Sequence, residues 1–187
     1  MLGFRCSEKR YPGSEQCTLS CVRSSDGKLE SINTSRGGVP KTAVFEAIVT
    51  CEGIVGDVQR DLRYHGGPER AVSIYSLDLI ADLQREGHPI APGSAGENLT
   101  VSGVDWSLLV PGCELQVGDV RLTVTGYAVP CANIRGSFRD EHFTRISQKV
   151  RPGWSRVYCR VVVPGTVRPG DPVRISQMPS TEPRNPT

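Results

Sequence analysis

Short runs of alternating hydrophobic and polar residues are the dominant pattern of this chain. Leu115 and Val117 alternate with polar residues before a Gly-Asp pair, and Val120, Leu122 and Val124 alternate after it. Alternating runs on both sides of a two-residue Gly-Asp turn predict a β-hairpin. Similar apolar runs predict further strands at residues 29–33, 43–49, 71–75, 157–163 and 167–175. Most of the chain is therefore expected to form short strands.

Two segments instead have helical spacing. In residues 76–85, Leu77, Ile80 and Leu83 recur at every third position after a serine that can cap the helix. In residues 138–150, apolar residues share one helical face and a Pro-Gly pair follows the last turn. The pattern therefore predicts helices at 76–85 and 138–150.

Composition supports a fold with many turns. The 187 residues include 20 glycines and 14 prolines, which is more than the average use of about 7% and 5%. Long helices disfavour both residues, so a helical bundle or a coiled coil is excluded. The expected architecture is mainly β, a closed or half-closed barrel with a few short helices.

The organisation of the chain follows from where apolar periodicity begins and ends. Residues 1–27 are polar, lack periodicity and are interpreted as an extension that carries Cys6, Cys17 and Cys21. These three cysteines have neither standard zinc-site spacing nor a fourth ligand nearby. Residues 28–175 form the expected barrel domain, and residues 176–187 form a loose tail.

Charge and cysteine content limit the function classes. The chain has 22 basic and 20 acidic residues, a net charge of +2, and no basic stripe with interleaved aromatic residues, so nucleic-acid binding is not expected. No apolar run reaches the length of a membrane span, and the N-terminus does not have the pattern of a secretory signal. Seven cysteines, an odd number, favour reduced thiols and a cytoplasmic location.

The first candidate for chemistry is the run Arg-Tyr-His-Gly-Gly-Pro-Glu-Arg at residues 63–70. Adjacent glycines can turn backbone N–H groups inward to bind an anion. Cationic side chains at both ends of the run would strengthen such a site. The alternative is an ordinary polar turn before a strand. The candidate binding residues are Arg63, His65, Gly66, Gly67 and Arg70.

A second loop, residues 92–99, is made of small residues and contains Glu97 and Asn98. An asparagine amide both donates and accepts hydrogen bonds, so it can recognise the edge of a heterocycle. A loop with a turn asparagine is the equally good alternative.

The third candidate is Cys131, which follows Pro130 just beyond the predicted hairpin. That position places a thiol at the end of a strand, where reactive groups often lie. Arg135 and Arg139 are close in sequence and could lower the pKa of the thiol. A thiolate would suit a soft metal or a persulfide, whereas a small buried residue is the alternative. The remaining cysteines, Cys51, Cys113 and Cys159, are interpreted as core.

Taken in order, these segments resemble the MOSC domain, which is found at the C-terminal end of molybdenum cofactor sulfurases and in small stand-alone proteins. The resemblance covers about residues 28–175. Its motifs lie at residues 31–33, 37–41, 53–57, 61–72, 92–99 and 130–131.

The resemblance implies a MOSC-type β-barrel, similar to the barrel of pyruvate kinase, that binds the molybdenum cofactor. It implies that Cys131 is the central thiol, either a sulfur carrier or a molybdenum ligand. His65, Gly66 and Gly67 match the family's His-Gly-Gly loop, and Glu97 and Asn98 match its Gly-Glu-Asn loop.

Two other functions remain open from the sequence. The chain could be a molybdenum-dependent reductase of N-hydroxylated bases or amines, or a non-catalytic barrel for another anionic ligand or a protein. The expected partners are a sulfur donor such as a cysteine desulfurase, or an electron-transfer protein. A homodimer is the default expectation for a small protein.

Overall fold

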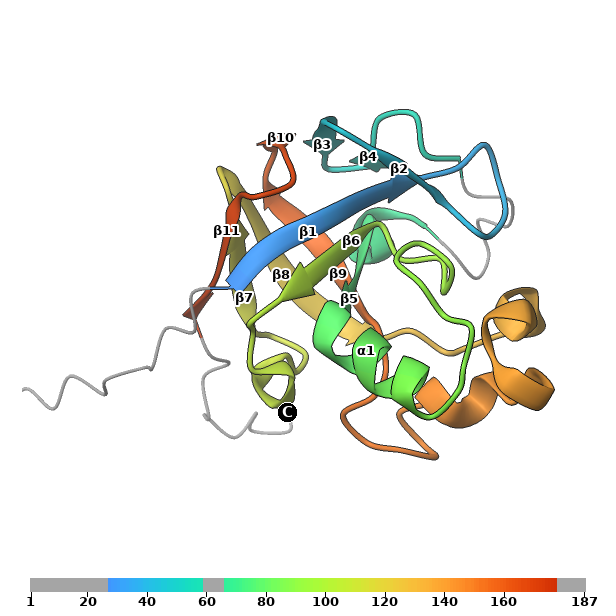
Figure 1. The fold of residues 1–187 in the computed structure, drawn as a ribbon. Helices are drawn as coiled ribbons and strands as arrows, with labels where there is room; N and C mark the ends of the chain where they lie inside the picture. Colours follow the sequence, from blue (N-terminus) through green and yellow to red (C-terminus); the bar gives the residue numbers. More distant parts are fainter. Residues whose placement is uncertain (1–26, 59–65, 178–187) are drawn as a thin grey trace, which may run out of the picture.

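Seven strands close into a barrel in the computed structural model, which describes residues 27–58 and 66–177 (Figure 1). Around the barrel the order is β11, β7, β8, β9, β5, β6 and β1, and pairing of β1 with β11 closes it; β2 continues from β1. The strands are β1 (Gly27–Thr34), β2 (Thr42–Val44), β5 (Val72–Ser76), β6 (Leu99–Ser102), β7 (Glu114–Val117), β8 (Val120–Tyr127), β9 (Val157–Val163) and β11 (Pro172–Gln177). The predicted mainly-β barrel is confirmed.

The predicted hairpin is present as β7 and β8. Val117 pairs with Val120 across the two-residue turn, and Leu115 pairs with Leu122. The remaining barrel contacts are antiparallel except the pair of β5 and β6, which is parallel. The site described below lies close to this parallel pair.

A second sheet of three strands lies beside the barrel, in the order β10 (Gly165–Val167), β3 (Ala47–Thr50) and β4 (Gly53–Ile54). The single strand predicted at residues 43–49 is therefore wrong in extent, because the chain divides between β2 and β3. Phe45 lies at the break and is 83% exposed. The segment 167–175 likewise divides, between β10 and β11.

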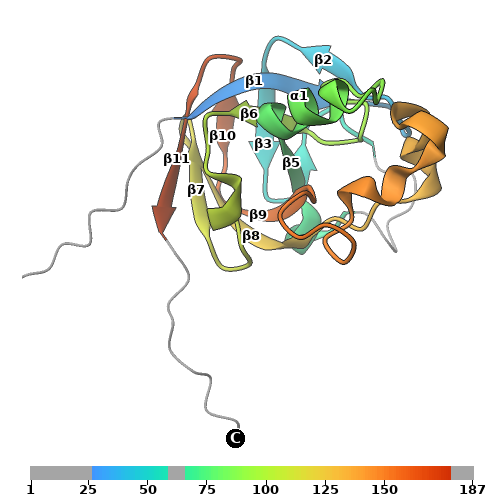
Figure 2. The same ribbon diagram turned by 60° about the horizontal axis from the view of Figure 1, so that its bottom comes forward.

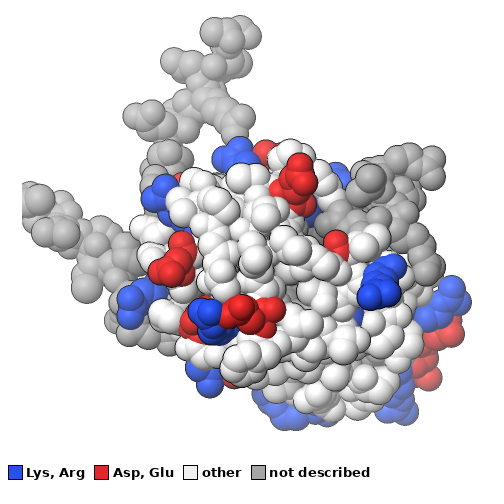
Figure 3. All heavy atoms as spheres, turned by 90° about the horizontal axis from the view of Figure 1, so that it is seen from above, with Lys and Arg blue, Asp and Glu red and all other residues white. Residues whose placement is uncertain are grey.

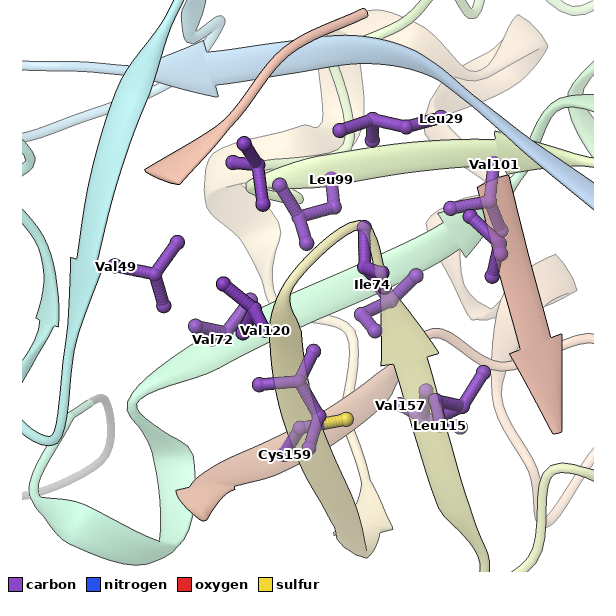
Figure 4. Close-up of a cluster of buried hydrophobic side chains, with 14 of the residues drawn as sticks. Leu29, Val49, Val72, Ile74, Leu99, Val101, Leu115, Val120, Val157 and Cys159 are labelled. Carbon is purple, nitrogen blue, oxygen red and sulfur yellow. The ribbon is translucent and has the colours of Figure 1, made fainter. Parts of the chain in front are cut away.

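The barrel is filled by inward-pointing aliphatic side chains, which Figure 4 shows meeting from several strands. Leu29, Ile74, Leu99, Leu115 and Val157 are fully buried there. Alternation along each strand places these residues on one face, which is why the sequence pattern identified them. Two of the three cysteines interpreted as core, Cys113 and Cys159, are in this cluster. The third interpretation was wrong, because Cys51 lies exposed in a turn.

The first predicted helix is confirmed as α1 (Leu77–Arg85). The Ser76 hydroxyl accepts a hydrogen bond from the N–H of Leu79, which is N-capping. Ile80 and Leu83 are buried on one face of the helix. α1 therefore covers one side of the barrel next to β5 and β6.

The second predicted helix, 138–150, is not formed. The chain there makes short 3-10 turns, namely η3 (Ala132–Ser137), η4 (Arg139–Glu141) and η5 (Phe143–Ile146), which lie together at one end of the molecule (Figure 2). Asp140 and Glu141 have positive φ angles, which an α-helix cannot contain. Long-range contacts prevail over the local periodicity, because Arg145 pairs with Glu86 at the end of α1. Two further 3-10 turns are η1 (Pro68–Arg70) and η2 (Trp106–Leu108).

The distribution of charged side chains on the surface is consistent with the nearly balanced numbers of acidic and basic residues. On the face in Figure 3, acidic and basic side chains are interspersed around a broad uncharged area. Among the described residues, no helix has the length and apolar character needed to cross a bilayer. The predicted extension and tail, with Cys6, Cys17 and Cys21, lie almost wholly outside the described residues.

Candidate functional site

A pocket of about 330 Å³ opens where segments that are far apart in the sequence meet. Its volume is at the lower end of the usual range for small-molecule sites. The wall comes from the loop between β1 and β2, from η1, from β5, from the loop before β6, and from the segments that start η3 and β9. The residues used below are Lys41, Gly66, Arg70, Gly96, Asn98, Cys131, Arg156 and Tyr158.

Cys131 lines this pocket as a half-buried, free thiol at the start of η3. The two arginines expected to act on it are directed elsewhere. Arg135 donates to the carbonyl of Ala132 and pairs with Glu141, and neither Arg135 nor Arg139 lines the pocket. The cations that share the pocket with the thiol are instead Lys41, Arg70 and Arg156.

Only some of the described residues in and after the His-Gly-Gly loop line the pocket. Gly66 and Arg70 line the wall, and the Arg70 guanidinium lies 6.0 Å from the centre of the Tyr158 ring. Gly67 is exposed and precedes η1. Arg63 and His65 lie outside the described residues, so their predicted roles stay predictions.

Glu97 is fully buried behind the pocket and is not part of its wall. Its Oε1 accepts a 2.6 Å hydrogen bond from the N–H of Gly93 and a 3.0 Å bond from the Thr100 hydroxyl, whereas Oε2 has no partner in the structure. Burial raises the pKa of the carboxyl, although these bonds and nearby Arg156 oppose the shift. Glu97 therefore fixes the shape of the loop from inside.

Asn98 lines the pocket, but its amide is occupied within the protein. The carbonyl oxygen accepts from both the N–H and the hydroxyl of Ser73, at 3.1 and 3.0 Å. The amide nitrogen donates to Asp57 at 2.9 Å and to the carbonyl of Asn33 at 3.3 Å. These four bonds use the full capacity of the side chain, so Asn98 ties β5 to β1 and to the segment that follows β4.

Lys41 and Asp57 form a nearly buried ion pair beside Asn98, with 2.5 Å between Nζ and Oδ2. Burial lowers the pKa of Lys41, and the contact with Asp57 opposes that shift. Sequence reasoning had assigned no role to either residue. Lys41 is nevertheless the last residue of the family motif at 37–41, and Asp57 is the last residue of the motif at 53–57. Their positions in these motifs were the sequence signal that could have identified them.

Arg156 is the second cation that sequence reasoning missed. The residue is 5% exposed, lines the pocket just before β9, and its Nε is buried without a hydrogen-bond partner. No spacing or motif in the sequence marks this arginine. Among the described residues, no cluster of three or more histidine, cysteine or acidic side chains is placed to hold a metal ion.

Comparison with known proteins identifies the family. The model of the MOSC domain matches residues 61–174, more than half of the chain. The chain belongs to the MOSC domain family. The Pro-Cys thiol, the Gly-Glu-Asn loop and most of the pocket wall lie inside the matched region.

The curated relatives are longer proteins. YflK of Bacillus subtilis is 29% identical over 135 residues, and YiiM of Escherichia coli is 28% identical over 136 residues. These matches cover 71% and 70% of this chain but only 60% and 59% of the relatives, so the chain spans about three fifths of their length. A protein named "Reductase" from Gibberella moniliformis is 29% identical, with 76% of this chain and 27% of that protein covered.

The crystal structure of YiiM from Geobacillus stearothermophilus has the same fold. It superposes with a TM-score of 0.62 at 22% identity, over 81% of this chain and 75% of that chain. At this identity the likeness shows the fold alone.

Proposed function

We propose that this MOSC-domain protein binds the molybdenum cofactor in the pocket and uses Cys131 as sulfur carrier or molybdenum ligand. One observation supports this most directly, namely that a free thiol shares a single pocket with Lys41, Arg70 and Arg156. The cofactor is a pterin with a phosphate and a dithiolene-bound molybdenum, and when bound it supplies a redox-active metal. A soft thiolate suits the metal, and the cations suit the phosphate.

The donor set fits this group. Arg156 is a buried cation whose Nε has no hydrogen-bond partner among the described residues, and Cys131 is free and accessible from the pocket. Asn98, whose amide is already occupied, holds the wall in place rather than offering spare donors. The family resemblance also assigns Arg63 and His65 to the cofactor, and both lie outside the described residues.

As a sulfur carrier, Cys131 would receive sulfur from a partner protein. Its thiolate attacks the outer sulfur of the donor's persulfide, the S–S bond of the donor breaks, and the donor's thiolate leaves with the electron pair. The products are a Cys131 persulfide and a free donor thiolate, so no external oxidant or reductant is needed. A cysteine desulfurase is the class of donor that this chemistry requires.

A reductase is the second candidate, and the similarity to the Gibberella moniliformis protein named "Reductase" supports it. Reduction of an N-hydroxylated amine to the amine and water takes two electrons and two protons. The described residues offer no second redox group besides thiols, so these electrons would come from an electron-transfer partner. A non-catalytic barrel that binds another anion is the third candidate.

The deciding experiment measures molybdenum and pterin in protein purified from a host that makes the cofactor. Wild type should contain both, and C131A should lose the metal or the sulfane sulfur that mass spectrometry detects on this residue. C51A is the matched control, because Cys51 is also free but lies in an exposed turn outside the pocket. Wild-type protein with neither molybdenum nor a Cys131 persulfide would overturn the proposal. Turnover of a hydroxylamine with a reducing partner would favour the reductase.

A further inference from the structure

The side chain of Arg156 differs from the other cations of the pocket in its bonding partners. Lys41 is paired with Asp57, and Arg70 makes contacts of its own that include the face of Tyr158. Arg156 has no hydrogen bond or ion pair from its guanidinium to any described residue, although it is 95% buried. Unpaired buried charges are costly and rare in folded proteins, so this one calls for an explanation.

Its surroundings hold the guanidinium in place. An ideal Cβ added to Gly96 would lie 3.5 Å from Nη1 of Arg156 and 2.9 Å from Val39 Cγ1. A side chain at residue 96 would therefore crowd the space between Val39 and the guanidinium. Residues 39, 96 and 156 all line the pocket, so the guanidinium packs in the wall rather than extending into solvent.

The backbone of Arg156 is also fixed before any ligand arrives. Its carbonyl accepts hydrogen bonds from the N–H of Ala128 at 2.8 Å and from the Ser155 hydroxyl at 3.0 Å. The indole of Trp106 donates to the carbonyl of Ser155 at 3.0 Å. A cation placed in this way loses little conformational freedom on binding, which favours affinity.

The buried acid Glu97 does not form an ion pair with Arg156. Glu97 influences Arg156 electrostatically, but the two form no ion pair, and Glu97 bonds instead to Gly93 and Thr100. Burial raises the pKa of Glu97, which favours its neutral form. No acidic side chain of the described residues forms an ion pair with Arg156, so its positive charge is available to a ligand.

We propose that Arg156 is the anion-binding residue of the pocket and that it binds an oxyanion group of the phosphate type. A guanidinium presents several N–H donors in a planar fork that matches two oxygens of such a group. Under the proposed function, on which the identity of the ligand rests, this group is the phosphate of the pterin. A free phosphate ion has the same chemistry and serves as the probe.

A structural role for Arg156 and a ligand-binding role predict opposite effects of its replacement on the stability of the ligand-free protein. If Arg156 served the fold, its replacement would destabilise the ligand-free protein. If it serves a ligand, removal of an unpaired buried charge leaves the ligand-free protein as stable or more stable. Stability and binding together therefore distinguish the two roles.

The test measures inorganic phosphate binding to ligand-free protein by calorimetry and by thermal shift, with chloride at equal ionic strength as reference. R156Q should bind phosphate at least about tenfold more weakly than wild type, and R156K should fall between them because it keeps the charge without the fork. R160Q is the matched control. Arg160 lies four residues further along, is half exposed, pairs with Glu69 and does not line the pocket.

Equal phosphate affinity in wild type and R156Q would overturn the proposal. So would a ligand-free melting temperature far below that of R160Q in both R156Q and R156K, because a structural role would then explain the burial. The measurement needs no molybdenum, so its failure is separate from failure of the proposed function. In the cofactor-producing host, retained phosphate binding together with absent pterin would keep the anion site and reject the cofactor as its ligand.

Discussion

The backbone N–H of Ala128 donates a 2.8 Å hydrogen bond to the carbonyl oxygen of Arg156. Ala128 follows β8 directly and precedes Cys131 by three residues, whereas Arg156 directly precedes β9. The bond therefore joins the segment that carries the thiol to the segment that carries the buried cation. Because β8 and β9 are also paired along the barrel, both groups are held by one rigid frame.

The cysteines should differ sharply in reactivity. Burial raises the pKa of Cys113 to about 11 and also raises that of Cys159, whereas Cys51 is exposed and Cys131 is half-buried. Because the thiolate is the reactive form, iodoacetamide at pH 8 should label Cys51 and Cys131 in the folded protein. Peptide mass spectrometry should find Cys113 and Cys159 labelled only after unfolding. Early labelling of Cys159 would contradict this assignment.

The ion pair of Lys41 and Asp57 should matter for stability as well as for the pocket. D57N leaves Lys41 buried without its carboxylate partner, and such changes cost about 3–5 kcal/mol. The loss should appear in urea unfolding. D82N is the control, since Asp82 pairs with Arg85 on the exposed side of α1 and should cost less than about 1 kcal/mol. Equal effects of the two variants would show that burial does not strengthen the first pair.

Gly93 should tolerate no side chain. Its φ is +80°, and a Cβ would lie 2.6 Å from the carbonyl oxygen of Lys41. Gly153 has φ of +81° but open space around it, so G153A isolates the backbone cost of about 1–2 kcal/mol. G93A should cost about 1–3 kcal/mol more than G153A in chemical unfolding because of the added crowding. Matching losses in the two variants would mean that the loop moves freely away from Lys41.

The buried carboxyl of Glu97 should make stability depend on pH. Burial raises its folded pKa above 4.5, so the folded protein holds this proton more tightly than the unfolded chain does. The contribution is complete below about pH 4.5 and is lost as pH rises through the folded pKa. E97Q keeps an acceptor for Gly93 and Thr100 and removes the titration.

Relative to wild type, E97Q should therefore become more stable at pH 8 than at pH 5 in urea unfolding. E69Q is a suitable control, because Glu69 is largely exposed and pairs with Arg160 at the surface. A stability difference between E97Q and wild type that does not change with pH would show that Glu97 titrates normally.

The fold could be predicted where the information is local. The alternation around residues 118 and 119 specifies the hairpin, because turn chemistry and strand pairing are both encoded within twelve residues. The helix predicted at residues 138–150 does not form, because the structure of that segment depends on contacts that are distant in the sequence. Its apolar spacing fits a helix, but Arg145 is bound to Glu86, which lies 59 residues earlier in the chain. No local pattern contains that contact.

Local sequence information identified only some of the residues that line the pocket. Cys131, Gly66 and Arg70 belong to recognisable motifs, and the structure brings them to one pocket. Arg156 is one of many arginines in the chain, and among the described ones its side chain is marked by a buried Nε without a hydrogen-bond partner. That property arises from tertiary packing, so no reading of spacing or residue type would have found it.

The pairing that closes the barrel can form only late in the synthesis of the described chain. Among the described residues, β1 and β11 pair at Gly27–Val173 and Lys28–Pro172, so a short seam joins the first described strand to the last. A ribosome must synthesise nearly all of the described chain before this seam can form. Closure therefore comes late and has a high contact order, and until it occurs the edges of β1 and β11 are open to other chains.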